Sequence, residues 1–283
     1  MRLRFLGTAA GGGLPQWNCG CPQCEDARRD PAVARTQDCM AVSGDGQSWY
    51  LLNASPDLHT QLARVPELAP LPGTRATPIR GVLLTSAELD HTLGLVGMRQ
   101  ATTLSVYATK PVQMAVTGVL ECYTTVDWQP MPTRLDGGLT VTAFPVSSKR
   151  PRYAADLPDA PDWAIALRLD SAHGSVVYAP CLPDEDAVAA VADIGADVII
   201  LDGTFYDAAE LATCPPGVAG HLPIRDSLPI LRRRRGPRYL YTHLNNTNPA
   251  ALAGTPAYRA VLDAGVEIAP ENGFITLDPP PER

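Results

Sequence analysis

Apolar and polar positions along the chain form short runs that predict a mixture of strands and helices. Runs of strand length fall at 2–6, 40–43, 49–53, 81–84, 104–108, 139–144, 164–169, 175–179, 198–201, 239–241, 266–269 and 273–277. Helical patterns fall at 58–65, 111–121, 183–191, 227–234 and 256–264. Early strands follow one another with a Gly44-Asp45-Gly46 hairpin signal, whereas later strands alternate with helices. This order favours mixed sheets in an α/β fold over a doubly wound parallel sheet.

Composition is that of an ordinary folded protein. Of the 283 residues, 45% are hydrophobic and 19% are charged, which is typical of globular domains. The 28 prolines fall mostly in turns and linkers, and the chain shows no internal repeat. We therefore expect residues 1–283 to form one domain.

Charge and hydropathy exclude several classes of function. The net charge of −7 argues against a general nucleic-acid binder, and the basic run at 232–235 is interpreted as a solvated helix end. No stretch is apolar for long enough to cross a membrane, so membrane insertion is not expected. The apolar part of the first residues is too short for a signal peptide, which makes the cytoplasm the expected compartment.

Metal-binding side chains gather directly after one predicted strand. The run at 81–84 is followed by Glu88, Asp90 and His91, and a helix pattern begins after them. Ligands of open α/β sheets are held at the carboxyl ends of strands. This loop is therefore a candidate metal-binding loop.

Two further strand ends and one loop carry the same kinds of side chain. Asp202 follows the run at 198–201, His243 follows the strand ending in Thr242, and His221 lies in the loop Gly220-His221-Leu222-Pro223. Alone, such an aspartate is usually a turn residue and such a histidine a core or surface residue. Together at strand ends, carboxylates and imidazoles have the composition of a catalytic metal site.

Three of the seven cysteines are crowded into the segment Cys19-Gly20-Cys21-Pro22-Gln23-Cys24. In a chain without an export signal this clustering favours metal over disulfides. Three thiolates at this spacing can hold one face of a tetrahedral zinc, although ordinary buried thiols are the alternative. The fourth ligand stays open among Asn246, His221 and Cys39. Packing explains the isolated Cys122, Cys181 and Cys214 well enough.

These motifs resemble the pyrroloquinoline quinone (PQQ) biosynthesis protein B family, a branch of the metallo-β-lactamase superfamily. The resemblance extends from the first loop to the last third of the chain. The stretches that carry it are Gly7 to Gly13, Pro15-Gln16-Trp17-Asn18-Cys19 with Cys21 and Cys24, Arg35-Thr36-Gln37, Ala41-Val42-Ser43, Asn53-Ala54-Ser55-Pro56-Asp57, Ala87 to Leu95, Leu201-Asp202-Gly203-Thr204-Phe205, Gly220 to Ile224, and Leu244-Asn245-Asn246-Thr247-Asn248-Pro249.

The resemblance implies an αββα sandwich of two mixed sheets with a metal site at one edge. It also implies a part in making PQQ, whose glutamate and tyrosine come from a precursor peptide that has been cross-linked and trimmed. The family resembles an iron- and oxygen-dependent hydroxylase of the tyrosine ring. The expected partners are thus a small Glu-Tyr intermediate and dioxygen. An older idea for the family is a part in exporting the finished cofactor.

The chain departs from the superfamily pattern at the first metal half-site. The loop of the superfamily reads His-x-His-x-Asp-His, but here Ser86 and Glu88 stand at the first two histidine positions. A third histidine is expected near 146–149, where this chain has Val-Ser-Ser-Lys. We therefore expect that half-site to be empty. A water bridging two metals, which two-metal hydrolysis uses, is then not expected.

The remaining half-site suits ferrous iron, because two histidines and one carboxylate are the usual ligands of iron oxygenases. The hypothesis is that Asp90, His91 and His243 hold Fe(II). Asp202 and His221 are further ligand or acid/base groups, with Glu88 nearby. His221 is nominated as the base that removes the phenolic proton. Zinc would bind the same ligands, so the metal itself is not determined.

Three alternatives stay open at this stage. A non-catalytic carrier would bind the finished quinone tightly without consuming oxygen. A one-metal hydrolase would cleave esters or phosphodiesters. For the assembly, a homodimer is the expectation from base rates alone.

Overall fold

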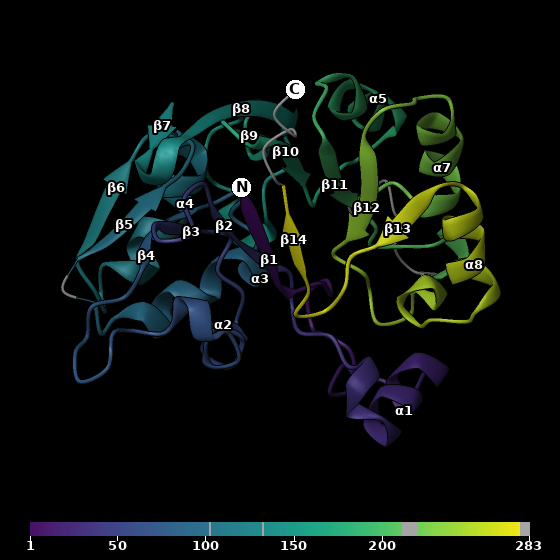
Figure 1. The fold of residues 1–283 in the computed structure, drawn as a ribbon, viewed down its shortest axis with the longest axis horizontal. Coiled ribbons are helices and arrows are strands. Elements are labelled where there is room, and N and C mark those ends of the chain that lie inside the picture. The colour runs from purple at the N-terminus through teal and green to yellow at the C-terminus, as the bar shows by residue number, and fades with distance from the viewer. Residues whose placement is uncertain (102, 132, 211–219, 278–283) are drawn as a thin grey trace, which may run out of the picture.

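Two seven-stranded sheets form the centre of the molecule in the computed structural model, which describes residues 1–101, 103–131, 133–210 and 220–277 (Figure 1). The first sheet has the order β14-β1-β2-β3-β4-β5-β6. Its strands are β1 (Arg2–Gly7), β2 (Cys39–Ser43), β3 (Trp49–Leu52), β4 (Ile79–Leu83), β5 (Leu104–Tyr107), β6 (Val126–Gln129) and β14 (Phe274–Thr276).

The second sheet has the order β13-β12-β11-β10-β9-β8-β7. Its strands are β7 (Arg134–Leu135), β8 (Leu139–Ser147), β9 (Ala164–Ser171), β10 (Gly174–Ala179), β11 (Val198–Asp202), β12 (Arg238–Thr242) and β13 (Val266–Ile268). In both sheets an antiparallel part joins a parallel part. The mixed α/β architecture predicted from the order of apolar runs is confirmed.

Helices cover the outer faces of the two sheets (Figure 1). They are α2 (Leu58–Ala63) and α4 (Lys110–Leu120) on the first sheet, and α5 (Glu185–Asp193), α7 (Ile224–Arg232) and α8 (Pro256–Asp263) on the second. The helix α1 (Pro22–Arg29) lies below the sandwich in this view, and the short α3 (Leu89–Thr92) lies in the loop after β4. One apolar cluster packs between the sheets, and two more pack between each sheet and its helices. This layering is the αββα sandwich. None of the described helices is both long enough and apolar enough to cross a membrane.

Most predicted elements are present, with small changes at their ends. The hairpin predicted at Gly44-Asp45-Gly46 joins β2 to β3, with Gly46 at a φ of 75° that favours glycine. The helix predicted from residue 183 begins at Glu185 because the Asp184 carboxylate accepts the Ala187 N–H at 2.8 Å. Among the described α-helices and strands, α1, β6 and β7 were not predicted from the sequence, and the helix predicted after His91 already begins at Leu89.

A buried polar network links the two sheets beneath the strand ends. The Asp38 carboxylate accepts hydrogen bonds from the Tyr178 hydroxyl of the second sheet and from Thr242 at the end of β12. Asn53 donates to the Tyr178 oxygen at 3.4 Å and accepts from the Thr85 N–H at 2.9 Å. Burial raises the pKa of Asp38 to about 6. The carboxylate therefore depends on these donors, because it is sequestered from water.

We predict that Tyr178→Phe lowers the free energy of unfolding by about 1–3 kcal/mol, since Asp38 then loses a buried donor and Asn53 loses an acceptor. Urea denaturation is the measurement. Tyr123→Phe is the control, because Tyr123 is 60% exposed and its loss should change stability by less than about 0.5 kcal/mol. Equal stabilities of the two variants would contradict the structural importance of this network.

Candidate metal centre

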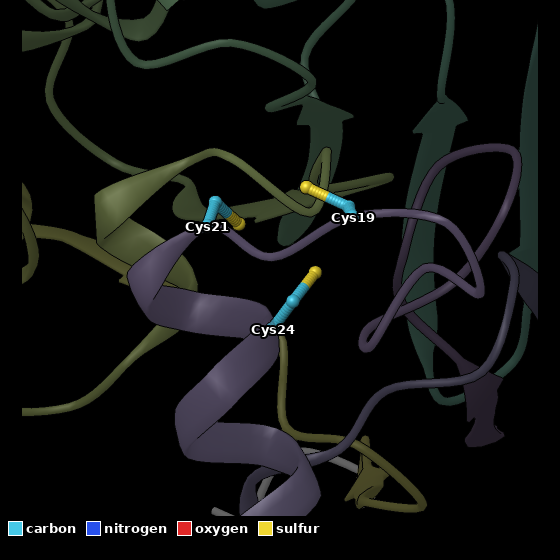
Figure 2. A group of neighbouring side chains, drawn as sticks. All are labelled: Cys19, Cys21 and Cys24. Carbon is cyan, nitrogen blue, oxygen red and sulfur yellow. The ribbon is translucent and has the colours of Figure 1, made fainter.

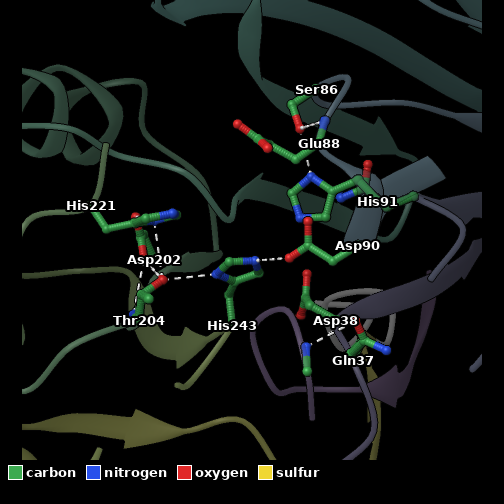
Figure 3. A network of polar contacts seen from close by, with 12 residues as sticks. Gln37, Asp38, Ser86, Glu88, Asp90, His91, Asp202, Thr204, His221 and His243 are labelled. Carbon is green, nitrogen blue, oxygen red and sulfur yellow. Dashed lines mark hydrogen bonds and ion pairs between the residues drawn. The ribbon is translucent and has the colours of Figure 1, made fainter. Parts of the chain in front are cut away.

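Two overlapping groups of metal-binding side chains lie where the two sheets meet (Figure 3). Asp90, His91 and His243 each offer a ligand atom within 4.8 Å of the others, and so do Asp202, His221 and His243. His243 belongs to both groups. Five of the residues that the sequence predicted for this site are therefore brought together, from the loop after β4, the end of β11, the loop before α7 and the end of β12. The sixth, Glu88, lines a cavity with Asp90, His221 and His243.

His91 is fully buried, and one of its ring nitrogens lacks a partner. Its Nδ1 lies 2.7 Å from the Ser86 hydroxyl, which also accepts the Glu88 N–H at 3.2 Å. Its Nε2 is buried and has no hydrogen-bond partner among the described residues. Burial lowers the pKa of His91 to about 4, although the negative charge of Asp90 acts to raise it. His91 is therefore a neutral imidazole at neutral pH, as a metal ligand must be.

His243 makes the contact that joins the two halves of the site. Its Nε2 lies 3.1 Å from Asp90 Oδ2, and its Nδ1 lies 2.8 Å from Thr204 Oγ1. Its backbone has a φ of 57°, in the left-handed region that side chains other than glycine rarely adopt. Burial works against the charge, yet the hydrogen bond to Asp90 and the nearby carboxylates raise the pKa of His243 to about 9. Without a metal, the imidazolium thus donates to Asp90.

Thr204 orients the second group, and sequence reasoning did not single it out. Its hydroxyl donates to Asp202 Oδ1 at 2.7 Å and therefore accepts from the Nδ1–H of His243. Asp202 Oδ2 accepts from His221 Nδ1 at 2.7 Å. In this arrangement the Nδ1 atoms of His221 and His243 are both donors, so that their Nε2 atoms are left to bind a metal or a proton.

The positions that depart from the superfamily pattern also have defined roles here. Ser86, Glu88 and Ser147 line one small cavity together with His221. Burial and the nearby Asp90 charge raise the pKa of the Glu88 carboxyl. At the three positions where the superfamily pattern predicts histidines, this chain thus has two hydroxyl side chains, Ser86 and Ser147, and one carboxylate, Glu88. Sequence reasoning also missed Cys181, whose side chain lines the same cavity.

The three clustered cysteines form a separate group whose sulfur atoms converge (Figure 2). Cys21 is the residue before α1 and Cys24 lies in its first turn. The three sulfur atoms lie within 4.8 Å of one another. The side-chain Nδ2 of Asn246 lies 3.4 Å from Cys24 Sγ, and its backbone oxygen lies 3.5 Å from Cys21 Sγ. Asn246 is thus the candidate fourth partner that the structure places beside the cluster.

The other two candidates for the fourth position lie elsewhere. The ring of His221 pairs with Asp202 in the first site. The fully buried Cys39 thiol donates to the backbone oxygen of Asn53 at 3.2 Å. Of the three candidates left open by the sequence, Asn246 is therefore the one beside the cysteines, since sequence spacing carries no information on distant contacts. Cys214 lies outside the described residues.

The charge of His243 predicts a pH dependence for the metal-free protein. A folded pKa of about 9, against an ordinary 6.5, stabilises the fold below pH 6.5, and this stability is lost as the pH rises through 9. The size is on the order of 3 kcal/mol. Urea unfolding of chelator-treated protein at several pH values measures it. His243→Gln should lack this loss, and an unchanged slope in the variant would contradict the assignment.

Comparison with known proteins places the chain in a family. Residues 48–244 match the model of the β-lactamase superfamily domain. Coenzyme PQQ synthesis protein B of Methylobacterium radiotolerans is 35% identical over 98% of this chain and 100% of its own length. The protein of the same name from Methylococcus capsulatus is 36% identical with the same coverage.

Solved structures agree with this placement. The Zn(2+)-bound crystal structure of PqqB from Methylobacterium extorquens superposes with a TM-score of 0.88 at 30% identity, covering 98% of this chain and 100% of that one. A diphosphatase of the PhnP family has a TM-score of 0.71 and 18% identity over 98% of each chain, which shows likeness of fold alone. The chain belongs to the coenzyme PQQ synthesis protein B family within the β-lactamase superfamily.

Proposed function

We propose that this protein acts in PQQ biosynthesis as an iron- and oxygen-dependent hydroxylase of the tyrosine ring in a small, cross-linked Glu-Tyr intermediate. Family membership supports the pathway, since the relatives carry the name of PQQ synthesis proteins. The donor set at the site supports the chemistry. Ester or phosphate hydrolysis is less well supported, because the side chains of the first half-site are Ser86, Glu88 and Ser147 instead of histidines.

The single observation that carries the proposal is the unpartnered Nε2 of His91. A buried polar atom without a partner is costly unless something binds it. Two other ligand atoms, from Asp90 and His243, lie within 4.8 Å. Two imidazoles and one carboxylate are the usual protein ligands of ferrous oxygenases, and they leave positions for oxygen and substrate. When bound there, Fe(II) would supply the binding and activation of dioxygen.

The chain's own residues would orient the substrate phenol and take its proton. His221 Nδ1 donates to Asp202, which fixes the orientation of the ring and leaves its Nε2 as the nitrogen that can accept a proton. That nitrogen is the proposed acceptor of the phenolic proton. Glu88 and His221 line the same cavity of about 230 Å³, beside Asp90 and His243. A phenol in this cavity would lie between the proposed iron ligands and the proposed base.

The test is oxygen uptake with product mass. The protein is loaded anaerobically with Fe(II), the cross-linked Glu-Tyr intermediate is added, and oxygen is admitted. Uptake coupled to a gain of oxygen mass in the product supports the hydroxylase. Tight binding of finished PQQ without uptake would favour a carrier, and cleavage of chromogenic esters would favour a one-metal hydrolase.

We predict that His91→Ala and His243→Ala each lower iron affinity and turnover by about 100-fold or more, because each removes a proposed ligand. Iron content after desalting and oxygen uptake are the measurements. His59→Ala is the matched control, since His59 is exposed and lines a different cavity. Full activity in either site variant would show that the iron ligands are assigned wrongly.

We further propose that Cys19, Cys21 and Cys24 bind a structural zinc, with Asn246 as the nearby fourth partner. Cys24→Ser should remove about one equivalent of zinc per chain and lower the melting temperature. Metal analysis and thermal unfolding measure both effects. Cys122→Ser, at an exposed thiol, should change neither. Undiminished zinc in Cys24→Ser would refute the site.

A further inference from the structure

Lysine is rare in this chain and occurs at a chemically central position. The 23 basic residues include two lysines, Lys110 and Lys149, and all the others are arginines. Lys149 begins the segment Lys149-Arg150-Pro151-Arg152, two residues after the end of β8 at Ser147. It lines all three cavities found around the metal centre, of about 20, 230 and 760 Å³. Lys149 therefore stands where these cavities meet.

The Lys149 side chain lies against the loop that leads into His221. A Cβ atom added at Gly220 would lie 2.9 Å from Lys149 Cδ and 3.1 Å from its Nζ. Gly220 also has a φ of 88°, so only glycine suits the position. The ammonium charge acts on the nearby Glu88, where it opposes the increase in pKa caused by burial and Asp90. Its charge is thus directed into the site.

The rest of the segment holds its shape and extends the positive charge outward. Arg150 Nη1 pairs with Asp159 at 2.9 Å and also donates to the Leu157 carbonyl, which ties the segment to its own following loop. The Tyr153 hydroxyl donates to the backbone oxygen of Ala87 and fixes the segment beside the metal loop. The exposed Arg152 lines the outer, 760 Å³ cavity, which also contains Lys149.

Without Lys149 and Arg152, an anionic substrate would be repelled by the negative charges of the site. The site itself contains Glu88, Asp90 and Asp202, and the chain has a net charge of −7. A molecule built from glutamate and tyrosine carries three carboxylates, two from the first residue and one from the second. Paired cations at the mouth of a cleft lower the cost of bringing such a molecule in and fix its orientation.

We propose that Lys149 and Arg152 form a carboxylate-binding subsite that selects an aromatic substrate carrying two or more carboxylates. This deepens the proposed function and rests on it for the identity of the aromatic group. Lys149 is the inner point charge, beside the reacting ring, and Arg152 is the outer, planar group that can bind a carboxylate through two N–H donors. The cavity of about 760 Å³ is large enough for such a ligand.

Amine labelling tests the subsite without any turnover. The probes are PQQ and its trimethyl ester, both reduced anaerobically to the quinol so that no quinone carbonyl can react with an amine. The protein is treated with an amine-reactive reagent, and labelled peptides are quantified by mass. The free triacid should slow labelling of Lys149 by about 5-fold or more, whereas the ester should not. Lys110 is the internal control, since it lies at the start of α4. Equal protection of both lysines, or of neither, overturns the proposal.

Binding by variants tests the same subsite independently. Lys149→Gln should weaken binding of the triacid quinol by about 10-fold and Arg152→Gln by about 3-fold, because each removes a charged hydrogen-bond donor. Lys149→Arg should restore most of the affinity, and Lys110→Gln should leave it unchanged. The advantage of the triacid over the ester should shrink at high salt. If Lys149→Gln binds the triacid as tightly as the natural sequence does, the subsite is refuted.

These measurements test the carboxylate-binding subsite independently of the proposed hydroxylase activity. They need neither iron nor oxygen, so an inactive protein with a protected Lys149 would refute the hydroxylase and leave the subsite in place. Oxygen insertion with an unprotected Lys149 would give the opposite outcome.

Discussion

The partly buried contact between His243 and Asp90 is the interaction on which the site depends. Asp90 comes from the loop after β4 of the first sheet, and His243 follows β12 of the second sheet. Their side chains meet at 3.1 Å, so the site exists only where the sandwich is closed. The left-handed backbone at His243 is strained for a residue other than glycine, and the packing of both sheets must sustain it. We therefore expect folding and metal binding at the proposed site to be coupled.

The side chains that orient the two histidines beside this contact are neutral hydroxyls. A charged side chain at the same place would compete with the histidines for a metal ion. Ser86 fixes one nitrogen of His91, and Thr204 does the same for His243. Beneath them the Asp38 network ties β12 to the first sheet. Replacing the leading histidines of the superfamily loop thus removes ligands of one half-site and gives Ser86 a part in orienting the other. This asymmetry is consistent with one metal and open space beside it.

The sequence alone predicted what depends on local pattern. Strands with continuous apolar runs, such as 198–201, were found, and the polar residues at their ends converge because parallel strands end at one edge. The helix α1 was missed because only Cys24 and Ala27 of its residues are buried, which leaves no apolar period. The two-residue β7 is too short to carry a pattern.

Residues that act through distant contacts could not be predicted in the same way. Asp38 and Thr204 are ordinary in sequence, and their roles arise from hydrogen bonds to partners up to 204 positions away. The signal for Thr204 was its place two residues after Asp202. The cysteine cluster shows the same limit: the spacing predicted three convergent thiols, whereas only the fold brings Asn246 beside them.

Anomalous diffraction at the iron edge, from crystals loaded anaerobically with Fe(II), tests the central claim most directly. One iron atom within bonding distance of His91 Nε2, His243 Nε2 and an Asp90 oxygen is the predicted result. Two iron atoms, or a single one held beside Ser86 and Glu88 away from His91, would contradict the account of a one-metal site.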